Sequence, residues 1–363
     1  MYYDDKDLLD VCIASQKNTE IVGCSVKSKN IVLIIGETYN RHHSSLYGYD
    51  LETMPECKNF GAIVFSDVIS PANATTSVFR YLLSFAEVNG NERWCDTPLF
   101  PSIFRQAGYN VVFYSNQYVV EGELGFYDAS AGFFNHPAIY GQLFNTRNHS
   151  RFGYDMGLVD DFKQNRTSLE TDSLNLIIFH LIGQHSPAVE RYPHEYSDFS
   201  VDDYNRPDLS KEQLQYIADY DNATRYNDSV IAEIVRMFEN QDAIVIYFAD
   251  HGEEVYDFRD KAGRFYDFDK TGADGLHNQI DVPFLVFASE KYRESHPEVM
   301  AAISDAVKKP FMTDLLPHLL LGLAGIDCKW YDAMKDLFNP CYDSSRHRFL
   351  SGTDIDYDEV CGR

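Results

Sequence analysis

The chain has 363 residues, 44% of them hydrophobic, which is enough for a large core. Aromatic residues make up 14% of the sequence, a content that excludes disorder over most of the length. The formal charge of −25, from 31 basic and 56 acidic residues, repels phosphate backbones and argues against nucleic-acid binding. No apolar run reaches the ~18 residues that a membrane-spanning helix needs.

Apolar runs that end in turn residues predict the strands of a buried, mostly parallel sheet. In chain order the predicted strands are Ile31–Ile35, Ala62–Phe65, Asn110–Tyr114, Leu174–Leu181, Ala243–Phe248 and Pro283–Ala288. Helical patterns separate them, and the longest, Lys211–Glu239, carries a single apolar stripe. Strands that alternate with helices predict an α/β sandwich around this sheet.

Three regions lack sustained periodicity, namely residues 120–172, 188–210 and 253–276. We interpret them as long loops that decorate one end of the sheet, where long loops are often functional. Residues 1–29 are mixed and polar and are interpreted as a linker or a peripheral helix. The sequence thus predicts one domain over residues 30–363.

Acidic and imidazole side chains follow two predicted strands at their carboxyl ends, where open α/β sheets bind ligands. Glu37 follows Ile31–Ile35, and Asp250 and His251 follow Ala243–Phe248. A glutamate at the end of a buried strand is costly unless it is paired or ligated. Mixed oxygen and nitrogen ligands suit zinc or manganese. The alternative for Asp250 and His251 is a turn with a capping aspartate and a surface histidine.

Three further histidines have structural alternatives. His180 lies inside an apolar run, so a buried core histidine is the better interpretation of that residue alone. His185 follows in a turn with Gly183 and Pro187 and is expected to face a site. His277 precedes the strand at Pro283 and is ambiguous by itself.

The segment Ser70–Ser77 predicts a turn that feeds a helix with hydroxyl side chains at its start. Serine and threonine there act as helix caps. A threonine at a helix N-terminus can also serve as a nucleophile, because the helix dipole and free N–H groups favour a transferring phosphate. The two interpretations are compatible.

Taken together, these motifs resemble the bacterial phosphoethanolamine transferases, members of the alkaline phosphatase and sulfatase superfamily. The matching segments are Gly36–Tyr49, Ser70–Phe85, Tyr114–Gln117, His180–Pro187, Tyr220–Tyr226 and Ala249–Glu253. They occur in the family's order, and residues beyond Ser289 match only loosely.

The resemblance implies one tight zinc ion, with a second ion left open and manganese less favoured. Its ligands would be Glu37, Asp250, His251 and the hydroxyl of Thr75. Thr75 would be the nucleophile that becomes phosphorylated, and Thr76 is the alternative because only the pattern Asn-Ala-Thr-Thr sets the alignment.

The resemblance also implies the residues that would meet the substrate. His185 and His277 would act in catalysis, through contacts with the transferred phosphate or a second metal ion. The substrate contacts would be His180, His185, His277 and Asn116.

The implied reaction moves phosphoethanolamine from phosphatidylethanolamine to lipopolysaccharide through a covalent intermediate on the threonine. The resemblance implies a monomeric domain in the periplasm, preceded in the chain by an inner-membrane anchor. It also implies a role in antimicrobial peptide resistance. Many relatives bracket the nucleophile with a disulfide, and here no cysteine lies between Cys57 and Cys95. The acceptor therefore stays open between lipid A and a core sugar.

Three other functions are weighed against this one. A sulfatase needs a Cys or Ser in a C/S-x-P/A-x-R motif, which does not follow Thr75. A phosphoglycerol transferase shares the fold and the threonine nucleophile, and only the closer motif match argues against it. A non-enzymatic sensor on the same fold would be expected to lose ligands, which this chain retains.

Overall fold

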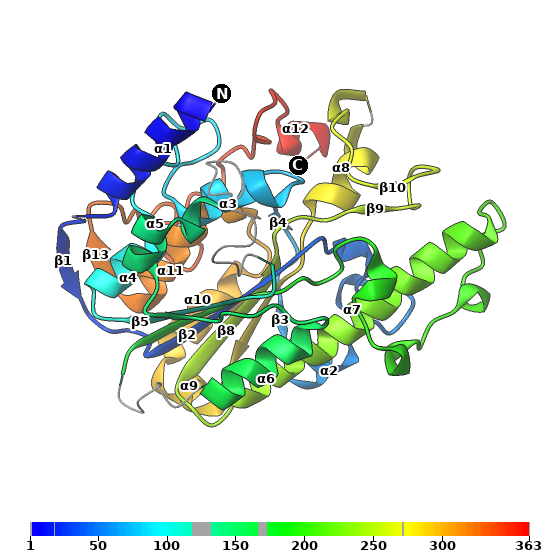
Figure 1. Ribbon diagram of the computed structural model, residues 1–363, viewed down its shortest axis with the longest axis horizontal. Coiled ribbons are helices and arrows are strands. Elements are labelled where there is room, and N and C mark those ends of the chain that lie inside the picture. Colours follow the sequence, from blue (N-terminus) through cyan, green and yellow to red (C-terminus); the bar gives the residue numbers. More distant parts are fainter. Residues whose placement is uncertain (1, 18, 118–131, 166–172, 271, 363) are drawn as a thin grey trace.

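The computed structural model describes residues 2–17, 19–117, 132–165, 173–270 and 272–362, and its core is a twisted central sheet (Figure 1). Within the described residues this sheet has seven strands in the order β3-β11-β8-β2-β7-β5-β6. Their bounds are β2 (Asn30–Gly36), β3 (Ile63–Val64), β5 (Asn110–Ser115), β6 (Thr146–Arg147), β7 (Asn175–His180), β8 (Ala243–Ala249) and β11 (Phe284–Ala288). The smaller strands are β1 (Ile21–Cys24), β4 (Val68–Ile69), β9 (Glu254–Val255), β10 (Ala262–Gly263), β12 (Phe311–Met312) and β13 (Ile326–Cys328).

The central strands β2, β7, β8, β5 and β6 run parallel, whereas β11 is antiparallel to β8. Every residue of β2 and β8 is buried, as expected for parallel strands covered on both faces. The predicted α/β architecture and the predicted mostly parallel sheet are therefore both confirmed. The register of β2 pairs Ile35 with Phe248 of β8 and with His180 of β7, so these three strands end at one level.

Helices cover the sheet on both sides. Their bounds are α1 (Tyr2–Ser15), α2 (Pro55–Asn59), α3 (Thr75–Leu83), α4 (Phe100–Gln106), α5 (Pro137–Leu143), α6 (Asp155–Asn165), α7 (Lys211–Phe238), α8 (Gly272–Ile280), α9 (Glu290–Ser295), α10 (Pro297–Ala306), α11 (Leu316–Ala324) and α12 (Tyr357–Val360). In Figure 1, α6 and the long α7 flank one side of the sheet, and α3, α4, α5 and α11 lie on the other. This gives the three layers of an α/β/α sandwich.

The prediction of a continuous loop over residues 120–172 was wrong for the described part. That part contains α5, β6 and α6, while residues 120–131 and 166–172 lie outside the described residues. The helix α6 buries Leu158, Val159 and Phe162 and packs against α7. With eleven residues, α6 is too short to show a sustained apolar period in the sequence. A helix of this length is only marginally stable alone, so α6 depends on its packing against α7.

Residues near the N-terminus pack onto the domain. In α1, Cys12 is fully buried, and β1 pairs antiparallel with β13. The link from residues 1–29 to a membrane region stays a prediction. Of the helices in the described residues, none combines the length and apolar character needed to cross a membrane.

The C-terminal residues lie across the segment that leads into α3. The buried Arg348 pairs with Asp67 at 2.8 Å and with Asp358. A backbone hydrogen bond of 2.8 Å joins Ser351 N to Pro71 O, and β12 pairs with β4. These contacts hold residues 67–71, which lead into the turn before Thr75.

Candidate metal and nucleophile site

Four predicted side chains meet at the carboxyl ends of β2 and β8: Glu37, Thr75, Asp250 and His251. The Thr75 hydroxyl donates to Glu37, with Oγ1 2.9 Å from Oε2 and 3.2 Å from Oε1. Nε2 of His251 lies 3.3 Å from Thr75 Oγ1 and 3.2 Å from Glu37 Oε1. Asp250 Oδ2 is 3.6 Å from the same nitrogen. One nitrogen and several oxygens thus converge on one point.

The parallel register brings these groups together. Gly36 pairs with Ala249, and Asp250 N donates to Gly36 O at 3.0 Å, so Glu37 and Asp250 leave adjacent strands side by side. Gly183 packs against this turn with a φ of +51°, and a Cβ there would lie 2.7 Å from the carbonyl oxygen of Glu37. Only glycine permits both that backbone conformation and that close approach.

The donor set fits a zinc ion. Glu37, Asp250 and His251 are fully buried, and Asp250 Oδ2 accepts no hydrogen bond of ordinary length from the described part of the chain. A buried carboxylate oxygen without a partner is costly, and a cation would satisfy it. His251 Nδ1 lies 2.8 Å from Gly252 O, which places a proton on Nδ1 and turns Nε2 towards the carboxylates, as in metal-binding histidines.

The site's electrostatics point the same way. Burial and the nearby Glu37 carboxylate raise the pKa of Asp250 to about 7. Burial opposes protonation of His251, but the carboxylates of Asp250 and Glu37 outweigh it and raise that pKa to about 9. Burial would raise the pKa of Glu37, yet the hydrogen bond and charge of His251 hold it below its usual range. A positive charge between two buried carboxylates this close stabilises both, and a metal ion would supply it.

Thr75 begins α3, and its hydroxyl faces Glu37 and His251. Ala74 occupies the cap position, so the hydroxyl is not used as a helix cap. The hydrogen bonds between described residues join Glu37 to Thr75 and not to Thr76. Two residues upstream, Asn73 Nδ2 donates to Gln279 Oε1 of α8 at 3.0 Å, which anchors the turn.

Gln117 lies in the matched segment Tyr114–Gln117 but was not among the predicted site residues, and it contacts this site. Its Nε2 donates to Glu37 Oε2 at 3.0 Å and to Leu181 O at 2.8 Å, and it lies 3.0 Å from His180 Nε2. His180 is fully buried, and burial lowers its pKa to about 4, so its ring is neutral. Gln117 therefore ties Glu37 to the backbone at Leu181, next to His180.

Arg264 is a second contact of this site that was not predicted from the sequence. It follows β10, is exposed, and places Nη1 3.4 Å from His251 Nε2. It therefore adds a cation at the open side of the site. Nothing in its local sequence distinguishes it from Arg259, which pairs with Asp267 instead.

The predicted substrate contacts His185, His277 and Asn116 lie apart from the four side chains that meet at the strand ends. His185 is half-buried in the turn after β7, with Nδ1 2.9 Å from Ser186 O. His277 faces Asp281, and Asn116 is buried with Oδ1 accepting from Phe152 N at 2.7 Å and Nδ2 donating to Asp155. Among the described residues, no hydrogen bond joins any of these three to Glu37 or Thr75.

Comparison with known proteins defines the class. Residues 29–326 match the Sulfatase family model, and the chain therefore belongs to the Sulfatase family. The solved structure of the C-terminal periplasmic domain of EptC from Escherichia coli, in complex with zinc, is 28% identical with a TM-score of 0.78. The match covers 92% of this chain and 93% of that one.

Within the family, the curated relatives that match are named phosphoethanolamine transferases, which confirms the resemblance seen in the sequence. EptC of Escherichia coli K12 is 29% identical over 345 residues, covering 92% of this chain and 58% of that protein. The Kdo(2)-lipid A phosphoethanolamine 7''-transferase of the same strain is 27% identical over 281 residues, covering 76% and 47%. The chain thus spans about half the length of these relatives.

Proposed function

We propose that this chain is the catalytic domain of a zinc-dependent phosphoethanolamine transferase in which Thr75 carries the group between donor and acceptor. The observation that supports this most directly is the Thr75 hydroxyl, directed at Glu37 and His251 at the strand ends. The relatives' names and the zinc complex of the EptC domain support the same chemistry.

In this proposal Glu37, Asp250, His251 and Thr75 hold the zinc ion. When bound, zinc would lower the pKa of the threonine hydroxyl and offset negative charge on the phosphate. Gln117 fixes one oxygen of Glu37, so the carboxylate keeps its direction when substrate enters.

The reaction has two displacements at phosphorus. Thr75 Oγ1 loses its proton and attacks the phosphodiester of phosphatidylethanolamine, the bond from phosphorus to the diacylglycerol oxygen breaks, and that oxygen takes up a proton. An acceptor oxygen then loses its proton and attacks phosphorus, the bond to Thr75 breaks, and Thr75 Oγ1 takes up a proton again. Arg264 pairs with non-bridging phosphate oxygens, since a guanidinium offers two parallel N–H donors. In this scheme His185 moves protons to and from the reacting groups. His277 stays a predicted substrate contact.

We propose lipopolysaccharide as the acceptor, by analogy with the relative named for Kdo(2)-lipid A, and the periplasm as the compartment, by analogy with the EptC domain. The proposal leaves lipid A and core sugar as alternative acceptors. The parent protein would be anchored in the inner membrane.

Mass spectrometry of the intact protein after incubation with phosphatidylethanolamine tests the proposal. We expect a mass gain of one phosphoethanolamine group, and peptide mapping should locate it on Thr75. A parallel incubation with phosphatidylglycerol should give no adduct. An adduct only with phosphatidylglycerol would favour a phosphoglycerol transferase, and no adduct with either lipid would contradict the proposal.

A further inference from the structure

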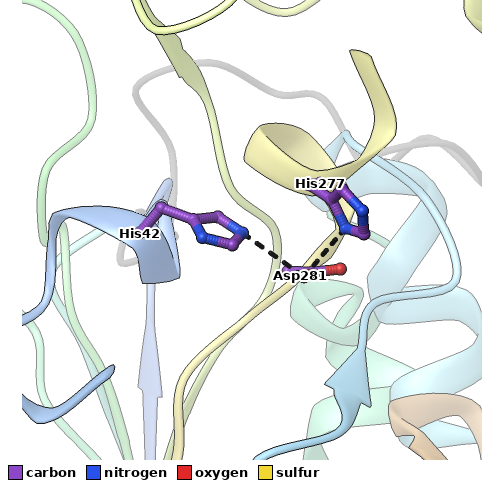
Figure 2. A group of neighbouring side chains, drawn as sticks. All are labelled: His42, His277 and Asp281. Atoms are coloured by element: carbon purple, nitrogen blue, oxygen red, sulfur yellow. Dashed lines mark hydrogen bonds and ion pairs between the residues drawn. The ribbon is translucent and has the colours of Figure 1, made fainter. Parts of the chain in front are cut away.

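A second group of potential ligands lies outside the Glu37 site. Figure 2 shows Asp281 between the imidazole rings of His42 and His277. His42 belongs to the short turn Arg41–His43 that follows β2, whereas His277 lies on α8 and Asp281 follows one helical turn later. Asp281 Oδ2 is 3.3 Å from His42 Nε2 and 3.1 Å from His277 Nδ1. Segments far apart in sequence thus present two nitrogens and one oxygen to one point.

We propose that His42, His277 and Asp281 form a second binding site for a divalent transition-metal ion, separate from the Glu37 site. Zinc binds imidazole nitrogen and carboxylate oxygen at ~2.0–2.2 Å, so tetrahedral ligands lie roughly 3.3 Å apart. The two distances to Asp281 Oδ2 match that spacing. One donor atom from each residue also lies within 4.8 Å of the other two.

The surroundings hold the carboxylate as a ligand would need to be held. Asp281 has a side chain only 1% exposed. Tyr357 of α12 donates to Oδ1, and Arg41 pairs with Oδ2. Hydrogen bonds of this kind from surrounding residues orient metal ligands. The guanidinium adds positive charge beside the site, so we expect zinc to bind here more weakly than at the Glu37 site.

A purely structural ion pair would need fewer groups. Arg41 alone neutralises Asp281, and its guanidinium also donates to Ser66 O at 3.0 Å. Nitrogens of His42 and His277 nevertheless both approach Asp281 Oδ2, which Arg41 already contacts. The side chain of His42 is 44% exposed, and that of His277 is 28% exposed. This opening allows an ion to enter and water to complete its coordination.

A bound ion would tie together three parts of the chain. These are the turn after β2, the helix α8 and, through Tyr357, the C-terminal α12. Because Gln279 of α8 also accepts from Asn73 near Thr75, such an ion would stiffen a neighbour of Thr75. We infer a supporting ion that is exchangeable.

The test counts zinc ions in equilibrium dialysis of the metal-stripped chain against zinc chloride alone. We expect the wild type to bind two zinc ions, one tightly and one weakly. His42→Ala and His277→Ala should each lose the weak ion and retain the tight one. His194→Ala is the matched control, because His194 is also an exposed histidine and should not alter the count.

The complementary variant is Asp250→Asn, which should lose the tight ion and retain the weak one. Since His42 is largely exposed, His42→Ala is expected to fold normally, and circular dichroism checks this. A single zinc ion in the wild type would overturn the proposal. So would a weak ion that persists in folded His42→Ala, because it would then bind elsewhere.

Discussion

Oγ1 of Thr75, the first residue of α3, lies 2.9 Å from Oε2 of Glu37, the residue that directly follows β2. The first residue of α3 and a strand-end carboxylate thus meet although they lie 38 positions apart in the sequence. The hydroxyl is buried with an acid and an imidazole around it, which is the environment that activation of a threonine requires.

Replacement of this hydroxyl should stop transfer. We expect Thr75→Ala to lower the turnover rate by at least about 10³-fold, because the proposed covalent intermediate forms on the Thr75 hydroxyl. Stability should fall by only about 1 kcal/mol, the usual contribution of one hydrogen bond. Turnover of a soluble phosphoethanolamine ester measures the first effect and thermal unfolding the second. Thr76→Ala is the control and should stay active; the reverse pattern would assign the nucleophile to Thr76.

Metal binding at the Glu37 site should depend on Asp250. Asp250→Asn keeps the size of the side chain but removes its charge, and we expect it to lose both the tight zinc ion and turnover. Elemental analysis of the purified variant measures the metal. If the variant retains a full equivalent of tightly bound zinc, Asp250 is not a ligand.

Gln117 should act by positioning Glu37. Its amide donates to Glu37 Oε2 at 3.0 Å, and Gln117→Leu removes the donor at similar volume. We expect zinc affinity to fall about 10–100-fold, the usual effect of losing a hydrogen bond to a metal ligand. Competition with a chelator measures this affinity. Unchanged affinity together with reduced turnover would instead indicate direct contact between Gln117 and substrate.

Arg264 should bind substrate without holding the metal. Arg264→Ala should reduce kcat/KM by about 10–100-fold, since a charge-assisted hydrogen bond contributes roughly 1.5–3 kcal/mol, while the zinc content stays the same. Arg264→Lys should recover part of the loss because it keeps the charge. Lys261→Ala, at an exposed position on the same loop, is the control. A loss of zinc in Arg264→Ala would contradict this role.

His318 should make the fold sensitive to acid. Burial, with Lys335 nearby, lowers its pKa to about 3, below the ~6.5 of an unfolded chain. As pH falls through about 6.5 the unfolded chain therefore takes up the proton first, and the free energy of unfolding drops by up to about 1.4 kcal/mol per pH unit.

Urea unfolding at several pH values between about 7 and 5 measures this dependence. His318→Gln should flatten it, because glutamine does not titrate and can still accept the hydrogen bond from Asp332 N that Nδ1 receives at 3.2 Å. His194→Gln, at an exposed position, should leave the slope unchanged. An equal slope in wild type and His318→Gln would show that other groups cause the acid sensitivity.

The sequence by itself determined the sheet and the residues at its ends. Runs such as Ile31–Ile35 and Ala243–Phe248 are apolar and β-branched because both faces of a parallel strand are buried, so they were visible without a structure. Glu37, Asp250 and His251 follow those runs directly. Parallel pairing of β2 with β8 then brings these three residues to the same edge of the sheet, independently of the loop conformations.

Only the tertiary structure decided which other groups meet there. Gln117 and Arg264 reach the site from segments whose paths depend on long-range packing. His277 faces Asp281 from α8, a partner that its local sequence does not reveal, and its contact with substrate stays a prediction. Local periodicity reports which residues are buried, whereas contacts between distant segments are set when the layers pack together.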